Sequence, residues 1–216
     1  MDRSRSRLLE AELRALRAQI SPHFIYNSLT VIASFVRTDP DRARELLLEF
    51  ADFTRYSFRR HGDFTTLAEE LRSIDQYLTL QRARYGERLV VSLRIAPDLL
   101  PVPMPFLCLQ PLVENAIRHG MEGRAGPGQL SIVADDEGMD AHITVEDDGV
   151  GMDPDAVRRT LAGEVDDSAG IGLGNIDERL RQVYGDEYGL VVETAPGAGT
   201  KVHVRVPKYQ AGVHAS

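Results

Sequence analysis

Residues Gln110–Gly120 read QPLVENAIRHG, a helix-forming run that carries a carboxylate, a carboxamide and a guanidinium. In an α-helix Arg118 follows Asn115 by three positions, so the two side chains share one face, with Glu114 adjacent to them. Such a set of groups can hold magnesium and a polyphosphate together. A helix with one polar face is the alternative interpretation of this motif taken alone.

Residues Asp147–Gly151 read DDGVG and come directly after an expected strand. Gly149 and Gly151, at alternate positions, let the backbone approach a ligand closely. Asp147, at the strand end, can accept a hydrogen bond from the amino group of adenine. Asp-Gly is also a common turn, and that interpretation stays open for this motif alone.

A third glycine-rich motif, Gly170–Asn175, reads GIGLGN and follows a polar stretch. Its composition is typical of a mobile lid whose glycines and helix N-terminus close around phosphates. The spacing differs from the dinucleotide-binding fingerprint, and the Lys-Ser/Thr pair of a Walker A loop is missing.

The segments around these motifs alternate between strand and helix patterns. We expect an α+β fold with a mixed, largely antiparallel sheet and helices on one face. The expected strands are 89–95, 130–134, 141–145, 190–194 and 201–206, and the expected helices are 106–119 and 176–184. Pro97, Pro101, Pro103 and Pro105 form a rigid connector before the first of these helices.

The N-terminal third predicts a helical hairpin. A helix over 4–37 carries an apolar seam of Leu9, Leu13, Leu16 and Ile20, with Pro22 loosening or kinking it. Thr38, Asp39 and Pro40 predict the start of a second helix, which carries Leu46, Leu47, Phe50, Phe53 and Tyr56. Such a hairpin has little core of its own, so we expect it to pair with a second copy as a four-helix bundle.

Thr66 and Glu69 form a possible capping box for a further helix that runs to about Tyr85. It would connect the hairpin to the domain that follows. We therefore divide the chain into a hairpin (1–62), a connecting helix with the first strand (63–105), a core (106–208) and a tail (209–216), which we expect to be disordered.

Composition restricts the possible functions. The formal net charge is -8 in 216 residues, which disfavours direct binding to nucleic acid. We expect a cytoplasmic protein because an apolar export signal and a bilayer-spanning run are both missing from the sequence. Cys108 lies in an apolar setting and is expected to be a buried, inert thiol. The chain begins inside a predicted helix, so we expect an upstream sensory region, by which the full-length protein is possibly membrane-attached.

Together the three motifs resemble the ATP-binding fold shared by histidine kinases, DNA gyrase, the ninety-kilodalton heat-shock chaperones and the mismatch-repair ATPases. The resemblance implies magnesium-bound ATP as the cofactor, with the metal on Asn115 and possibly, through water, on Glu114. It makes Asp147 the adenine-binding residue. Gly149, Gly151, Gly170, Gly172 and Gly174, and Thr200 in the last box GAGT, match further nucleotide-binding boxes of this fold. Arg118, His119 and Asn175, which lie within these motifs, are expected to bind the nucleotide as well.

His23 lies in QISPHFIYNSL. With LAEELRSIDQYLTLQRARYG and QPLVENAIRHG downstream, it resembles the LytS-type sensor histidine kinases. That resemblance makes His23 the phosphoacceptor, with Glu114 and Arg118 as catalytic groups. It implies transfer to an aspartate of a response regulator, possibly one with a LytTR DNA-binding domain. A structural histidine is the alternative.

The sequence departs from commoner histidine kinases in two places. Phe24 occupies the position of an acid after the histidine, so Asn27, one turn later, is expected to orient the ring. Gln110 stands where many kinases have another asparagine. Glu114 is either a base or an organiser of metal-bound water, and His119 either touches phosphate or caps its helix.

Three rival functions remain. The first is an ATP hydrolase of the same fold with Glu114 activating water. The second is a nucleotide-gated dimeric binding module in which His23 is structural. The third, a protein-serine kinase of the anti-sigma type, fits less well because it needs no hairpin. The remaining histidines lack a shared metal-ligand spacing and are expected at the surface or in turns: His61, His142, His203 and His214.

Overall fold

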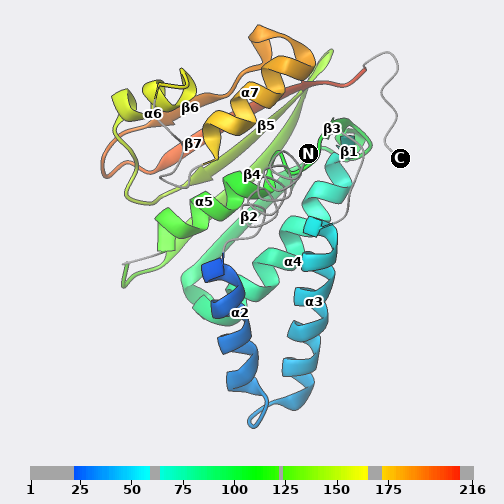
Figure 1. Ribbon diagram of the computed structural model, residues 1–216, viewed down its shortest axis with the longest axis vertical. Helices are drawn as coiled ribbons and strands as arrows, with labels where there is room; N and C mark the ends of the chain where they lie inside the picture. The colour runs from blue at the N-terminus through cyan, green and yellow to red at the C-terminus, as the bar shows by residue number, and fades with distance from the viewer. Residues whose placement is uncertain (1–21, 59–63, 122–123, 165–171, 210–216) are drawn as a thin grey trace, which may run out of the picture. The chain divides into compact units, whose positions relative to one another are not determined.

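The computed structural model describes residues 22–58, 64–121, 124–164 and 172–209. By their contacts the residues form two compact units (Figure 1). The helical unit comprises Met1–Arg60 and Asp75–Gly86, and the sheet unit comprises His61–Ile74 and Glu87–Ser216. The expected leucine seam, its junction with Pro22, most of the expected lid with Gly170, and nearly all of the expected tail lie outside the described residues.

The helical unit is built around an aromatic cluster. Helix α2 (Pro22–Phe35) buries Phe24, and helix α3 (Pro40–Phe58) buries Phe53. The ring centroid of Phe24 lies 5.0 Å from those of both Phe53 and Tyr77, the latter on helix α4 (Leu67–Tyr85). Aromatic pairs at such separations add stabilisation beyond the area they bury. The cluster fixes which side of α2 faces inward, and His23 is left exposed.

Two predicted helix starts are confirmed by their hydrogen bonds. The carboxylate of Asp39 accepts from the backbone amide of Arg42 at 3.0 Å, one turn into α3. At the start of α4 the amide of Glu69 donates to the Thr66 hydroxyl at 3.2 Å, and the amide of Thr66 donates back to the Glu69 carboxylate at 3.1 Å. The reciprocal pair is the capping box expected from the sequence.

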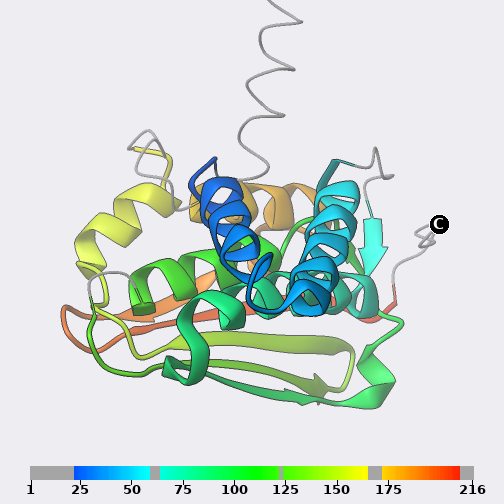
Figure 2. The ribbon, with the colours of Figure 1, turned by 90° about the horizontal axis from the view of Figure 1, so that it is seen from below.

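The sheet unit contains a five-stranded sheet in the order β2–β4–β5–β7–β6. Among the described strands of this sheet, β2 and β4 are the one parallel pair, so the expectation of a mixed, largely antiparallel sheet is confirmed. The strands are β2 (Leu89–Ile95), β4 (Gly128–Glu137), β5 (Asp140–Asp147), β6 (Val191–Thr194) and β7 (Thr200–Pro207). Figure 2 shows the helices α5 (Gln110–Met121), α6 (Pro154–Leu161) and α7 (Leu173–Tyr184) on one side of this sheet.

Helix α6 and two short strands were not predicted. Helix α6 follows the DDGVG motif, where Asp153 accepts from the amide of Asp155 and Pro154 occupies its first turn. The strands β1 (Phe64–Thr66) and β3 (Pro103–Pro105) pair as a small antiparallel ribbon. The second of these strands falls within the expected proline connector, and a three-residue strand is too short to show an alternating pattern.

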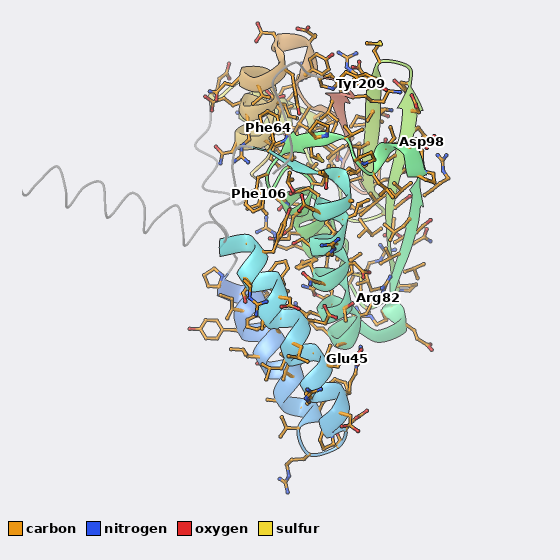
Figure 3. The ribbon with its side chains drawn as sticks, turned by 90° about the vertical axis from the view of Figure 1, so that its right-hand side faces the viewer. Glu45, Phe64, Arg82, Asp98, Phe106 and Tyr209 are labelled. Atoms are coloured by element: carbon orange, nitrogen blue, oxygen red, sulfur yellow. The ribbon has the colours of Figure 1, made fainter. Side chains whose placement is uncertain are left out.

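The predicted start of α5 at Phe106 is wrong, because the helix begins at Gln110. Residues 106–109 form a turn in which Leu107 has a positive φ of 54° (Figure 3 labels Phe106). The fully buried carboxylate of Glu70, on α4, accepts the backbone amides of Leu107, Cys108 and Leu109 at 2.8, 3.1 and 3.0 Å. A charged acceptor thus holds the turn, and α5 starts only after it.

Candidate functional site

Helix α5 places three of the predicted side chains together. Its buried side, with Val113 and Ile117, packs into the sheet unit, and Asn115, Arg118 and His119 are only partly buried. The Arg118 guanidinium donates to the Asn115 carboxamide oxygen at 3.2 Å and lies 3.3 Å from the His119 ring nitrogen Nε2. The expectation that Asn115 and Arg118 share a helix face is confirmed.

Glu114 ends a chain of side-chain hydrogen bonds that begins on α4. The Ser73 hydroxyl donates to the Gln110 carboxamide oxygen at 2.7 Å, and the Gln110 amide donates to the Glu114 carboxylate at 2.9 Å. Burial raises the pKa of Glu114 to about 7, although the Gln110 bond and the Arg118 charge act in the opposite direction. A carboxyl that titrates near neutral pH can give up or accept a proton under physiological conditions.

This raised pKa predicts a specific dependence of stability on pH. Between the ordinary value of 4.5 and about 7, the folded chain binds a proton at Glu114 that the unfolded chain has released. Stability therefore falls as the pH rises through that window, and the loss is complete above it. Glu114→Gln should raise the free energy of unfolding by about 1 to 3 kcal/mol near pH 8 and change it little near pH 4.

Urea unfolding at the two pH values measures this difference. Glu178→Gln, which neutralises an exposed carboxylate on α7, is the control and should show no such contrast. An equal effect of Glu114→Gln at both pH values would contradict the assignment.

Asp147 lies at the end of β5 and is largely buried, with 7% of its surface exposed. One carboxylate oxygen accepts the backbone amide of Gly149 at 2.8 Å. Burial raises the pKa of Asp147 to about 6, against the hydrogen bonds from the amides of Gly149 and Thr200. A Cβ on Gly149 would stand 2.6 Å from that same oxygen, so the close approach depends on glycine.

The loop after Asp147 is tied to the loop between β6 and β7. The amide of Gly197 donates to the Val150 carbonyl at 2.6 Å, and the amide of Met152 donates to the Thr194 hydroxyl at 2.9 Å. Asp147 and Thr200 are register partners across β5 and β7. The DDGVG and GAGT motifs are far apart in sequence, and these hydrogen bonds and this strand pairing bring them into contact.

Because these loops are in contact, a substitution of Gly151 should strongly lower the stability of the fold. The φ of Gly151 is +66°, and an added Cβ would meet the Ala195 carbonyl oxygen at 1.9 Å. Gly151→Ala should lower the free energy of unfolding by about 3 kcal/mol, because both the backbone conformation and the neighbouring loop must change. Gly126→Ala is the matched control, since its Cβ would meet nothing within 4 Å. Chemical denaturation of the two variants measures the difference, and equal midpoints would refute the expectation.

A small pocket gathers the predicted groups. Its walls are mostly apolar, and Asp147, Asn115, His119 and Thr200 supply polar atoms. A buried carboxylate among apolar walls fits a flat heterocycle with one amino group, such as adenine. The residues lining the pocket are Leu112, Asn115, Ala116, His119, Val145, Asp147, Met152, Leu173, Thr200 and Val202.

The start of α7 lies at this pocket. Gly172 is the N-cap residue with a φ of 61°, and Leu173 lines the pocket, while Gly174 and Asn175 occupy the first helical turn. The sequence did not single out Leu173 or Met152, although each directly follows a glycine of a recognised motif. Their apolar side chains form part of the wall that surrounds the polar groups.

A magnesium ion fits the side chains at this site only in company with a polyphosphate. Among the described residues there is no group of three or more His, Cys, Asp and Glu side chains placed to hold a metal. Magnesium is commonly held by one or two protein oxygens together with substrate phosphates. The Asn115 carboxamide oxygen and, through water, the Glu114 carboxylate would be those protein ligands.

His23 belongs to the helical unit and is exposed on the first turn of α2. The Asn27 amide lies 3.2 Å from the ring nitrogen Nδ1 and 3.1 Å from Nε2. This contact agrees with the expectation that Asn27 orients the ring, four residues later on the same face.

Both parts of the chain match known protein families. Residues 11–89 match the family model described as histidine kinase. Residues 104–210 match the model described as histidine kinase-, DNA gyrase B-, and HSP90-like ATPase.

Several relatives match along almost the whole chain, among them two sensor proteins and one uncharacterized protein. Sensor histidine kinase BtsS of Escherichia coli K12 is 33% identical over 206 residues, and sensor protein LytS of Staphylococcus haemolyticus is 34% identical over 205. These matches cover 95% and 94% of this chain and 35% of each relative. The putative uncharacterized protein YwpD of Bacillus subtilis is 36% identical over 198 residues, covering 90% of this chain and 69% of that protein. The chain thus spans about a third of the length of the two sensor proteins.

Proposed function

This chain belongs to the sensor histidine kinases of the LytS and BtsS type, and from that premise we propose that it transfers the γ-phosphoryl group of ATP to its own His23. The observation that carries the proposal is the pocket in which Asp147, Asn115 and Thr200 meet from three separate motifs. Its apolar walls and its buried carboxylate suit the adenine of ATP.

The reaction places few covalent demands on the protein. A ring nitrogen of His23 with a free lone pair attacks the γ-phosphorus, the N–P bond forms, and the bond from phosphorus to the leaving ADP oxygen breaks. Arg118 and the amides at the start of α7 stabilise the charge that spreads over the phosphoryl oxygens. Magnesium, when bound, neutralises phosphate charge. Asn27 orients the imidazole but is too weakly basic to remove its proton.

Dimer formation is supported by the surface of the helical unit. Several large apolar side chains on and beside α2 and α3 are exposed, among them Leu29, Val36, Leu47 and Leu48 at 44%, 55%, 50% and 52%. Exposed apolar groups on a small helical hairpin are typical of an interface that a second copy covers. We therefore assign the hairpin as a dimerisation and phosphotransfer element.

A phosphohistidine in such a kinase passes its phosphoryl group to an aspartate of a response regulator, which we propose as the partner. One of the LytTR DNA-binding type is supported by the similarity to LytS. None of the described helices is both long and apolar enough to cross a membrane. We propose a cytoplasmic location for this portion, with any membrane attachment provided by residues upstream of it.

The proposal is tested by incubating the protein with magnesium and γ-labelled ATP. A label on the protein that is lost in acid and kept in base identifies phosphohistidine. Turnover of ATP without label would instead support the hydrolase, for which the near-neutral pKa of Glu114 provides a base. Binding of ATP with neither label nor turnover would support the nucleotide-gated module.

A further inference from the structure

Two histidines meet on the face of the sheet opposite the helices. His142 lies on β5 and His203 on β7, where His203 is the register partner of Thr144. Their sequence neighbours Ile143 and Val204 are fully buried, and because side chains alternate along a strand, the histidines face the other way. The rings are within 6° of parallel, with centroids 5.1 Å apart.

Each ring is held by a glutamate through its outer nitrogen. His142 Nδ1 lies 3.2 Å from the Glu137 carboxylate, and His203 Nε2 lies 2.7 Å from the Glu193 carboxylate. An ionised carboxylate only accepts hydrogen bonds, so both outer nitrogens carry the proton. Both side chains are mostly covered, at 28% and 17% exposure. Orientation and tautomer are therefore set for both rings.

The two inner nitrogens then face each other. His142 Nε2 lies 3.2 Å from His203 Nδ1, and in neutral rings with protonated outer nitrogens both carry lone pairs. Two lone pairs at this distance repel each other. The Thr144 hydroxyl, 3.3 Å away, can donate to the lone pair of His203 Nδ1, and a cation between the rings, an added proton or a metal ion, would satisfy both lone pairs at once.

We propose that His142 and His203 form a binding site for a late first-row divalent metal ion such as Zn²⁺. Two nitrogens at this separation can both reach one Zn²⁺ at about 2.0 to 2.1 Å with an N–Zn–N angle of about 100°, close to tetrahedral. The outer carboxylates repeat the carboxylate–histidine–metal arrangement that orients metal-binding imidazoles. Imidazole ligands suit Zn²⁺, Cu²⁺ and Ni²⁺ better than Mg²⁺ or Ca²⁺.

The site supplies two imidazole ligands, fewer than a cluster of three, and the described residues contain no such cluster. Water molecules would complete the coordination of a bound ion. All the residues of the site belong to the sheet unit, and none of them lines the pocket that contains Asp147. The inference is therefore independent of the proposed kinase activity.

Titration calorimetry of the full, tag-free chain with Zn²⁺ alone tests the site. We expect one ion bound per chain, with proton release where Zn²⁺ displaces the shared proton. His203→Ala and His142→Gln should each weaken binding at least about 100-fold, and Glu193→Gln about 10- to 100-fold. Glu146→Gln is the matched control, because this carboxylate bonds Lys201 instead of a histidine, and it should leave the affinity unchanged.

Circular dichroism and thermal unfolding confirm that each variant is folded, and the histidine variants provide two independent tests of the pair. Absence of saturable Zn²⁺ binding would overturn the proposal. The close approach of the two rings would then be explained by a proton shared between their inner nitrogens. Binding that is equally tight in both histidine variants would also overturn it, since the ion would then lie elsewhere, for example at His119.

Discussion

Replacing His23 by glutamine should reduce the acid-labile label from γ-labelled ATP to background, a fall of at least about 1000-fold. His23 is the exposed ring at the start of α2, and glutamine has a similar length but no nucleophilic nitrogen. ATP affinity should stay unchanged, because the residues that line the pocket all belong to the sheet unit. Labelling and a nucleotide-binding titration on the same preparation separate the two effects.

Asn27→Ala is the companion to this variant. It removes the amide that lies beside both ring nitrogens of His23 but leaves the imidazole in place. We expect labelling to slow by about tenfold, a loss of positioning rather than of the acceptor. Label that persists on His23→Gln would contradict the assignment and direct the search to His119 or to a serine.

Asp147→Asn should weaken ATP binding at least 100-fold, about 3 kcal/mol or more. The Asp147 carboxylate is buried at the pocket and accepts from the amide of Gly149. The carboxylate accepts hydrogen bonds with both oxygens, whereas asparagine has an NH₂ group in place of one of them. That NH₂ group would face either the Gly149 amide or the adenine amino group, and both of these are donors. Binding of a fluorescent ATP analogue, and its displacement by ATP, gives the affinity.

The adjacent residue provides the matched control. Asp148 pairs with Arg124 at 2.9 Å and accepts the amide of Gln129 at 2.8 Å, so its carboxylate is used outside the pocket. Asp148→Asn should change ATP affinity by less than about threefold. If Asp148→Asn lost more ATP affinity than Asp147→Asn, Asp148 and not Asp147 would be the adenine-binding residue.

The same carboxylate predicts how ATP binding depends on pH. Because the pKa of Asp147 is raised to about 6, the acceptor form is populated above that value. As the pH falls below 6 the carboxyl binds a proton, loses acceptor capacity, and the affinity for ATP decreases. In Asp147→Asn this part of the pH dependence should disappear.

Much of the fold could be predicted because local chemistry decides where the elements begin. Asp39 and Thr66 sit at helix starts with the hydrogen bonds that their sequence context indicated. Strands β4 and β7 alternate buried and more accessible residues over enough positions to be recognised. The start of α5 could not be predicted, since an acid 37 to 39 positions earlier holds the preceding turn.

In the candidate site too, residues in local motifs could be predicted and residues that act through tertiary contacts could not. Asn115, Asp147 and Thr200 were identified from short motifs, and the structure brings them to one pocket. Ser73 was not identified, because its hydroxyl reaches Gln110 only through the packing of α4 beside α5. A serine on a helix carries no local signal for such a contact. Long-range hydrogen bonds of this kind depend on tertiary structure.

The three amides held by Glu70 determine which segment can fold as a separate module. The ATPase family model begins at residue 104, yet the turn at 107–109 takes its acceptor from α4, and Gln110 takes its partner from Ser73. A fragment limited to 104–210 would leave these three amide donors without their carboxylate, at about 1 to 3 kcal/mol each. A stable ATP-binding fragment of this chain should therefore begin upstream of Phe64, so that it keeps Glu70 and Ser73 of α4 with the core.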